Sequence, residues 1–373
     1  MLFRSELALR EDNAMKLHVV LAGGGTAGHI EPALAVADAI CKLREGVECS
    51  FLGTESGLEK LLVPKAGYQL KSIPRASLPR KFSLSALFFP VTFLNSVLAA
   101  YRALVGADIL IGFGGYVSAP AYLAARLRKI PIVIHEANAK PGWANRLGRN
   151  LAQVVAVNFE EVLNLWPNSV LTGMPIRDAI SSVSRLSGNE LNDFISLNRK
   201  SWGFNSDRPV MAIFGGSQGS AHINSVIADF LKTPESKKFQ IIHALGVNNP
   251  LPQARDGYLP LPYFHDMAAI YGSCDLLITR SGAVTCSEIM TVGRYAILVP
   301  LSHGNGEQIK NAQALVRQGR AVAIANNDFD KSWLVNNLDQ AIRSAQSLGH
   351  SPSDMHRGAA TRIAQLALAE VDK

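Results

Sequence analysis

The sequence is poor in cysteine and in paired ligand motifs. Only four of its 373 residues are cysteine, at positions 41, 49, 274 and 286, without a C-x-x-C pair or a histidine at zinc-ligand spacing. This composition excludes a disulfide-stapled scaffold and signals neither a structural zinc nor a redox motif. A reducing cytoplasm is the expected environment.

Long apolar runs and a strong charge bias are also missing. The most apolar stretch, residues 84–98, is interrupted by Pro90 and Asn95 and is shorter than the roughly 20 residues that a membrane-spanning helix needs. Residues 1–14 carry too many charges for a signal peptide, and we expect them to form a disordered tail. Lys and Arg number 37 against 30 Asp and Glu, so the net charge is +7, which suits phosphorylated substrates or an anionic membrane more than nucleic acid.

The chain instead shows regular alternation. Short β-branched runs alternate with helix-length amphipathic stretches, which is typical of parallel sheets covered by helices. We expect strands at 17–22, 49–52, 109–111, 132–134, 154–157, 210–214, 240–244, 276–279, 297–299 and 321–324, and one weak helix in the polar segment 181–207. The pattern predicts an α/β fold of two doubly wound, Rossmann-like domains facing across a cleft. Their expected extents are 15–175, completed by a C-terminal helix at 355–373, and 176–354.

Three glycine-rich corners each join a predicted strand to a predicted helix, at 23–29, 215–220 and 280–285. Glycines let the backbone approach a ligand closely, and the start of a helix presents free N–H groups, so each corner suits a phosphate. The first corner also has the G-x-G-x-x-G spacing of dinucleotide-binding proteins, so an NAD-linked oxidoreductase and a purely structural turn remain alternatives. Against NAD, the acid at the expected separation, Glu48, precedes its strand instead of following it.

Candidate catalytic and sugar-binding residues lie at these strand ends. His29 stands in the first turn of the helix after the first corner, where the helix N-terminus favours a neutral imidazole that can act as a general base. Glu288 lies early in the helix after the third corner, where a carboxylate can accept hydrogen bonds from a ribose diol. Tyr116, Glu136 and Asn138 follow two other strands of the first half and suit sugar hydroxyls and amides.

One acidic pair has a simpler explanation than metal binding. Asp328 and Asp330 have the D-x-D form of some metal–nucleotide sites, but a helical stretch follows directly, so Asp330 is predicted to be a helix N-cap. We predict no metal site.

Basic residues precede the apolar stretch. We predict that Arg75, Arg80, Lys81, Leu84, Leu87, Phe88 and Phe89 form a patch that docks on anionic lipid, because basic side chains beside exposed apolar ones favour a membrane surface. The alternative is a buried helix or helical hairpin.

Eight segments in unbroken order resemble one known family. They are GGGTAGHIEPALA, GFGGYVSAP, HEANAKPGWANR, TGMPIR, GGSQGSAHIN, FHDMAA, RSGAVTCSE and HGNGEQIKNA. Over residues 15–325 the chain resembles the MurG family, peripheral-membrane N-acetylglucosaminyltransferases that complete the lipid-linked peptidoglycan precursor. The resemblance implies a GT-B architecture at the cytoplasmic face of the cell membrane, with no cofactor. It also implies that the C-terminal half binds UDP-N-acetylglucosamine (UDP-GlcNAc) and that the N-terminal half binds the undecaprenyl-diphosphate-linked muramoyl-pentapeptide.

The resemblance further implies roles for single residues. Thr26, Ala27 and Gly28 would face a diphosphate beside the candidate base His29. Tyr116, Glu136 and Asn138 would line the cleft, with Asn138 near the donor sugar. Among the remaining donor contacts, Arg177 and Ser217 would hold the nucleotide or its phosphates, and the backbone near Phe264 would contact uracil. The diphosphate and the sugar would be contacted by Ala283, Val284, Thr285, Cys286 and Ser287. Glu288 would bind the ribose, and Gln308 would bind hydroxyls of the sugar or ribose.

These expectations together predict an inverting glycosyltransferase. It would move N-acetylglucosamine from UDP-GlcNAc to the 4-hydroxyl of the lipid-linked muramoyl sugar. Two alternatives remain: another GT-B UDP-sugar transferase acting on a different lipid or aglycone, and a non-catalytic protein that binds sugar nucleotides.

Overall fold

The computed structural model describes residues 16–76, 84–205, 207–301 and 305–373. The predicted tail, the residues Arg80 and Lys81, and the side chains of Leu84 and Leu87 lie outside this description. The chain divides into two compact units: unit 1 runs to Glu136 and includes Gly142–Ala156 and Ala360–Lys373, and unit 2 comprises Ala137–Pro141 and Val157–Ala359. Residues 157–175, which the sequence analysis assigned to the first domain, thus group with unit 2.

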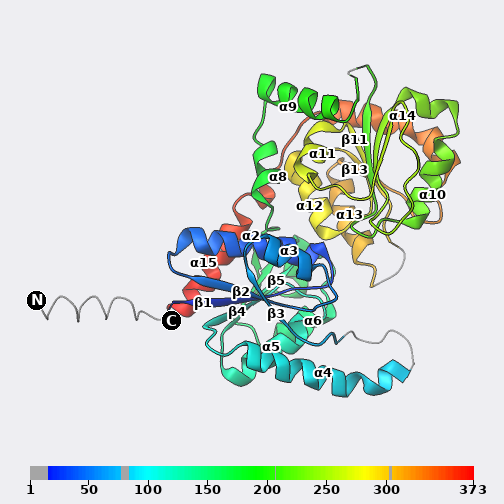
Figure 1. Ribbon diagram of the computed structural model, residues 1–373. Helices are drawn as coiled ribbons and strands as arrows, with labels where there is room; N and C mark the ends of the chain where they lie inside the picture. The colour runs from blue at the N-terminus through cyan, green and yellow to red at the C-terminus, as the bar shows by residue number, and fades with distance from the viewer. Residues whose placement is uncertain (1–15, 77–83, 206, 302–304) are drawn as a thin grey trace, which may run out of the picture. The chain divides into compact units, whose positions relative to one another are not determined.

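The first sheet has seven strands in the order β3-β2-β1-β4-β5-β6-β7 (Figure 1). Its strands are β1 (His18–Ala22), β2 (Glu48–Gly53), β3 (Gln69–Ser72), β4 (Ile109–Gly112), β5 (Ile132–Glu136), β6 (Val154–Val157) and β7 (Val170–Leu171). The associated helices of unit 1 are α2 (Ala27–Leu43), α3 (Glu59–Lys65), α4 (Leu84–Ala103), α5 (Ser118–Arg128), α6 (Trp143–Gly148) and α15 (Ala359–Val371). The pairs β2–β1, β1–β4 and β4–β5 are parallel, so these strands end at the same edge.

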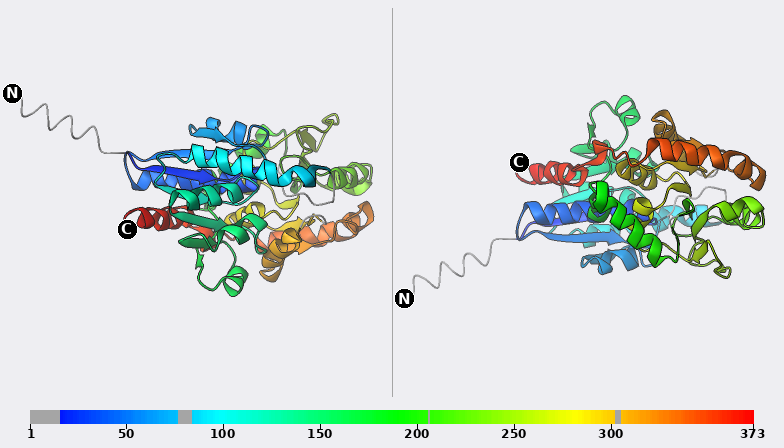
Figure 2. Two further views of the ribbon diagram at one scale, coloured as in Figure 1. Left: turned by 90° about the horizontal axis from the view of Figure 1, so that it is seen from below. Right: turned by 90° about the horizontal axis from the view of Figure 1, so that it is seen from above.

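Alternation along the central strands builds two cores. In β1, Val19 and Leu21 pack with α2, α3 and α15, whereas Val20 and Ala22 pack with α4 and α5 on the other face. Figures 1 and 2 show α15, in red, running alongside α2. The segment predicted as a helix from residue 355 begins with a short 3₁₀ turn, Asp354–His356, and α15 starts at Ala359.

The apolar stretch at 84–98 forms one continuous helix, α4, and not a hairpin. Its inner face is buried through residues such as Val97 and Ala100. Its outer face, however, exposes Phe88, Val91, Leu94 and Leu98, each 48–61% accessible and spaced at helical intervals. The alternative of a fully buried helix is therefore wrong. Within the described ranges, no helix is both long enough and apolar enough to cross a bilayer.

Unit 2 contains a six-stranded sheet in the order β10-β9-β8-β11-β12-β13. Its strands are β8 (Val210–Phe214), β9 (Gln240–Ala244), β10 (Tyr258–Leu261), β11 (Leu276–Thr279), β12 (Ala296–Leu298) and β13 (Ala321–Ala323). The helices are α7 (Glu160–Leu165), α8 (Asp178–Val183), α9 (Gly188–Ser201), α10 (Ala221–Phe230), α11 (Met267–Ser273), α12 (Ala283–Val292), α13 (Glu307–Arg317) and α14 (Lys331–Leu348), with a 3₁₀ turn at Pro234–Lys238. Helices α10 and α14 pack on one face, and α11 and α12 lie on the other (Figure 1).

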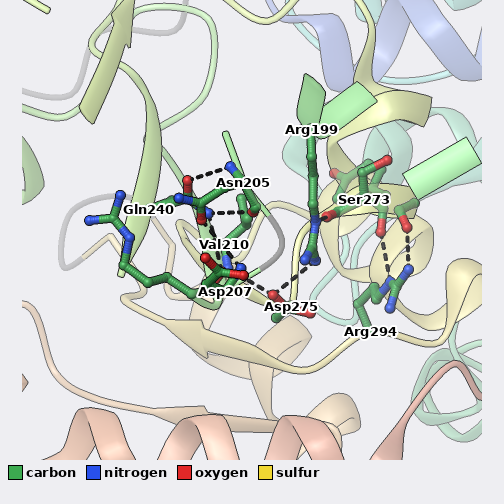
Figure 3. A network of polar contacts seen from close by, with 11 residues as sticks. Arg199, Asn205, Asp207, Val210, Gln240, Ser273, Asp275 and Arg294 are labelled. Atoms are coloured by element: carbon green, nitrogen blue, oxygen red, sulfur yellow. Dashed lines mark hydrogen bonds and ion pairs between the residues drawn. The ribbon is translucent and has the colours of Figure 1, made fainter. Parts of the chain in front are cut away.

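A polar network fixes the amino ends of the unit 2 strands (Figure 3). The Asp275 carboxylate, just before β11, accepts hydrogen bonds from the Val210 backbone N–H at 2.7 Å and from the Arg199 guanidinium at 2.9 Å. Gln240 exchanges two 2.8 Å hydrogen bonds with the backbone of Asn205. These contacts secure the edge opposite the glycine-rich corners, which leaves the carboxyl ends of the strands available for ligands.

All ten predicted strands are present, and their ends differ from the predicted ones by at most two residues. Three further strands, β3, β7 and β10, were not predicted, and each lies at the edge of its sheet. In the polar segment 181–207 the predicted helix is α9, and α8, which begins earlier at Asp178, ends just inside the segment at Val183.

Candidate functional site

The glycine-rich corners lie at the topological switch point of each sheet. In unit 1 the strand order reverses between β1 and β4, and in unit 2 it reverses between β8 and β11. Ligands of doubly wound sheets bind at such points, outside the carboxyl ends of the strands. The corners at 23–29, 215–220 and 280–285 follow β1, β8 and β11, so the structure places each at a position suited to a nucleotide or diphosphate.

His29 is half-buried in the first turn of α2. Its Nδ1 lies 3.1 Å from the backbone oxygen of Gly24 and 3.2 Å from Thr26 Oγ1. Because a carbonyl oxygen can only accept, Nδ1 carries the proton and Nε2 is the basic nitrogen. Burial is the largest influence and lowers the pKa of His29, while Gly24 and Glu59 oppose it. The imidazole is therefore neutral at pH 7, as a general base must be.

Tyr116 covers the same corner. A β-carbon at Gly25 would lie 2.6 Å from the Tyr116 ring, so the ring needs the bare glycine beneath it. The Arg75 guanidinium lies over the Tyr116 ring, 4.8 Å from its centroid. Tyr116 and His29 are thus brought to neighbouring loops of unit 1, as predicted from the strand ends.

Glu136 is buried at the end of β5, with 1% of its surface exposed. Its Oε2 accepts hydrogen bonds from the Gly142 backbone N–H at 3.0 Å and from Asn145 Nδ2 at 2.9 Å. Asn145 in turn accepts a hydrogen bond from Tyr122. These contacts favour a role for Glu136 in holding its loop, and its direct participation in catalysis stays a prediction.

The two glycine-rich corners of unit 2 differ in how their helices begin. Helix α10 is capped by its own Ser220, whose Oγ accepts from the Ile223 N–H, whereas α12 begins at Gly282 without a side-chain cap. The first N–H groups of α12, at Ala283 to Thr285, therefore have no protein side chain at their cap position. An anionic phosphate fits this start of α12 better than the capped start of α10.

The predicted contacts Arg177 and Glu288 are brought together. Arg177 Nη2 donates to Glu288 Oε1 at 2.8 Å, and the Tyr271 hydroxyl donates to Oε2 at 2.9 Å. Glu288 is 3% exposed, and the combination of burial and this carboxylate raises the pKa of Tyr271 well above its ordinary value. A ribose diol would have to share the Glu288 carboxylate with Arg177 and Tyr271. Neither of these partners is adjacent to Glu288 in the sequence.

Asn138 and Gln308 lie beside the third corner. The buried side chain of Asn311 donates to Asn138 Oδ1 at 3.2 Å and to the Ser281 oxygen at 3.3 Å, and accepts from the Ala139 N–H at 3.0 Å. Gln308 Oε1 accepts from the Leu301 N–H. Asn311 belongs to the segment HGNGEQIKNA, and the sequence analysis assigns it no role. A polar side chain in a predicted helix close to Gln308 is the sequence signal that points to it.

Three of the residues predicted to contact the donor are buried. The side chains of Phe264, Cys286 and Ser287 are at most 4% exposed. Phe264 packs against Phe214, and Ser287 Oγ accepts from Asn158 Nδ2 at 3.2 Å. Ser217, Val284 and Thr285 stay partly exposed.

Sequence reasoning gave Arg280 no individual role. Its guanidinium donates to Ser220 Oγ at 2.7 Å, to Asn326 Oδ1 at 2.7 Å and to the Val299 oxygen at 2.9 Å, which ties the corners after β8 and β11 to each other. The prediction for Asp330 is confirmed, because its carboxylate accepts from the Trp333 N–H at the start of α14.

Comparisons with known proteins agree with this geometry. Residues 19–157 match the N-terminal domain of glycosyltransferase family 28, and residues 210–367 match its C-terminal domain. The UDP-N-acetylglucosamine–N-acetylmuramyl-(pentapeptide) pyrophosphoryl-undecaprenol N-acetylglucosamine transferase of Thermobifida fusca is 40% identical over 356 residues, which is 91% of this chain and 92% of that protein. The protein of the same name from Corynebacterium efficiens is 43% identical over 345 residues, 91% of each chain.

Solved structures support the fold. Acinetobacter baumannii MurG is 26% identical and has a TM-score of 0.67, covering 95% of this chain and 99% of its own. UDP-GlcNAc 2-epimerase from Neisseria meningitidis, 14% identical with a TM-score of 0.63 over 95% and 100% of the two chains, shows the fold alone. The matched domains and the identity to the curated relatives lead to one conclusion: this chain belongs to glycosyltransferase family 28 and, within it, to the MurG family of N-acetylglucosaminyltransferases.

Proposed function

We propose that the chain transfers N-acetylglucosamine from UDP-GlcNAc to the 4-hydroxyl of the undecaprenyl-diphosphate-linked muramoyl-pentapeptide. One observation carries this: relatives named for this transfer are 40–43% identical over 91% of the chain. The switch-point corners and His29 supply the chemistry that such a transfer needs. The assignment of donor to unit 2 and acceptor to unit 1 is part of the proposal.

The donor would be held by its uridine diphosphate. The uncapped start of α12 offers backbone N–H groups and a partial positive charge to the diphosphate, and Arg177 adds a full charge nearby. As the bond from the anomeric carbon to UDP breaks, negative charge grows on the leaving diphosphate. Fixed donors stabilise that charge without reorganising at the moment of reaction.

The acceptor hydroxyl would be activated by His29. Its Nδ1–H donates to the Gly24 oxygen, so the Nε2 lone pair can take the proton of the attacking 4-hydroxyl. The oxygen then bonds to the anomeric carbon on the face opposite UDP, and the linkage formed is β-1,4. The proton ends on His29, and UDP leaves with the bonding electron pair.

Replacement of His29 tests this proposal. His29→Ala should lower kcat by about 10²–10⁴-fold, the contribution typical of a general base, and leave the affinity for UDP-GlcNAc nearly unchanged. His350→Ala is a matched control, because His350 lies in the loop after α14, and it should keep full activity. An equal loss of donor affinity in His29→Ala would make His29 a binding or structural residue instead.

We also propose that unit 1 docks on the anionic cytoplasmic face of the membrane through the outer face of α4. Phe88, Val91, Leu94 and Leu98 form an apolar row there, and the exposed Arg75 is the described basic member of the predicted patch.

Vesicle sedimentation tests the docking. Leu94→Glu should reduce binding to anionic vesicles by about tenfold or more, because the row is interrupted at its centre and a negative charge faces anionic lipid. Leu61→Glu is the matched control: Leu61 is 67% exposed on α3, which packs on the opposite face of the sheet. Equal effects of the two variants would remove α4 from the docking surface.

A further inference from the structure

The Glu59 carboxylate is enclosed by the first corner. The side chain is fully buried, and three uncharged groups donate hydrogen bonds to it: Thr54 N–H and Thr54 Oγ1, both 2.9 Å from Oε1, and the Gly25 N–H, 3.0 Å from Oε2. A buried carboxylate is costly unless its oxygens are hydrogen-bonded. Here the hydrogen bonds come from the loop after β2 and from the glycine-rich loop that carries His29.

The local sequence leaves room for this carboxylate. A β-carbon at Gly24, Gly53 or Gly57 would lie no more than 2.8 Å from an atom of the Glu59 side chain. None of these three glycines has a positive φ, so space, and not backbone conformation, requires them. The Glu59 side chain thus occupies the space that side chains at these three positions would otherwise fill.

One peptide group connects Glu59 to His29. The peptide between Gly24 and Gly25 accepts from His29 Nδ1–H through its oxygen, at 3.1 Å, and donates to Glu59 Oε2 through its N–H, at 3.0 Å. Hydrogen bonds in a chain polarise one another, so a carboxylate at the N–H end makes the carbonyl oxygen a stronger acceptor. That oxygen then stabilises a positively charged imidazole better than an isolated peptide would.

We infer that Glu59 is a positioning residue that acts through the Gly24–Gly25 peptide to fix the tautomer of His29 and to strengthen it as a base. The inference rests on the proposed role of His29 in the transfer. If Glu59 has this role, the catalytic machinery includes a residue of α3, a helix that contains none of the predicted site residues. It also gives the first corner a function besides phosphate binding.

The effect of Glu59 on the pKa of His29 has the direction that this arrangement requires. Burial lowers the pKa of His29, and the charge of Glu59 raises it, so Glu59 opposes the loss of basicity that burial causes. The other charged or titratable groups around this corner are Tyr116, Arg75 over its ring, and Glu136 behind Asn145. Arg75 is cationic and would act in the opposite direction to Glu59.

The test is the titration of His29 itself. In protein with labelled histidines, the NMR signal of His29 is assigned by its loss in His29→Ala and followed against pH. Glu59→Gln removes the charge with little change in volume, and the midpoint of the His29 titration should move to lower pH. The plateau of kcat should fall by about tenfold, part of the contribution of a general base, while KM for UDP-GlcNAc stays within about twofold.

Two variants complete the design. Glu59→Asp keeps the charge, and it should leave the His29 midpoint closer to that of the unmodified protein and recover part of kcat. Glu48→Gln removes an exposed carboxylate at the other end of β2, and it should change neither the midpoint nor kcat. If Glu59→Gln does not fold, as judged by loss of a cooperative thermal unfolding transition, the Asp variant and the His29 midpoint carry the test.

The outcomes separate this inference from the proposed function. An unmoved or raised midpoint in Glu59→Gln overturns the role of Glu59, whatever the activity. A lowered midpoint together with full activity of His29→Ala supports the link between Glu59 and His29 and contradicts the base role of His29.

Discussion

The buried amide of Asn311 should stabilise unit 2 and position Asn138. It makes three hydrogen bonds, to Asn138, Ala139 and Ser281, and none of its surface is exposed. At about 1 kcal/mol net for each bond, Asn311→Ala should cost about 3 kcal/mol. For a unit of this size that is a fall of roughly 6–12 °C in Tm. KM for UDP-GlcNAc should rise severalfold, because the segment that bears Asn138 loses its anchor.

The aspartate variant sharpens the prediction. In Asn311→Asp a carboxylate oxygen would face the oxygens of Asn138 and Ser281, which raises the pKa of the new acid. Stability should therefore be higher at pH 5, where the protonated acid can donate, and lower at pH 8. Thermal unfolding at both pH values measures this, with Asn336→Ala, an exposed position on α14, as the control within about 0.5 kcal/mol. A stability of Asn311→Ala equal to that of the control would refute the reasoning.

Three further predictions concern residues at or beside the glycine-rich corners. Tyr271→Phe removes one hydrogen bond to Glu288 and should cost about 1 kcal/mol in urea unfolding and raise KM for UDP-GlcNAc a fewfold; an unchanged KM would separate Tyr271 from the donor site. Arg280→Ala should weaken UDP binding more than uridine binding, since it removes a cation that holds Ser220, and Arg280→Lys should recover part of it; equal losses for both ligands would indicate a packing defect alone. Because burial lowers the pKa of His29 below 6.5, kcat should be at its plateau near pH 8 and fall in acid with a midpoint below pH 6.5, and a midpoint clearly above 6.5 in the pH–rate profile would contradict this.

The sequence predicts the strand ends well because the central strands are buried on both faces. Runs such as Val210–Phe214 must be apolar throughout, and the residues after them must then lie at one edge of the sheet. The unpredicted strands β3, β7 and β10 are edge strands, which have one free side and can be polar, short or interrupted by Pro260. Their pattern alone does not distinguish them from loops.

The partners of the site residues are harder to predict, since they depend on tertiary packing. Arg177 and Glu288 are 111 residues apart in the chain, and nothing in either motif indicates that they pair. Glu59 follows β2, at the strand end where ligand-binding side chains are expected, whereas Glu48, which has the spacing of a ribose-binding acid, lies at the opposite end of that strand. The outer face of α4 shows the same limit, since apolar composition does not tell an exposed helix face from a buried one.

The most direct test of the central claim is a transfer assay with UDP-GlcNAc labelled in the sugar and a short-chain lipid-linked muramoyl-pentapeptide. We expect equal amounts of released UDP and of a lipid-linked disaccharide in which the new sugar is β-1,4-linked. Loss of label to water, interconversion of the sugar nucleotide without acceptor, or transfer only to a different acceptor would contradict the account.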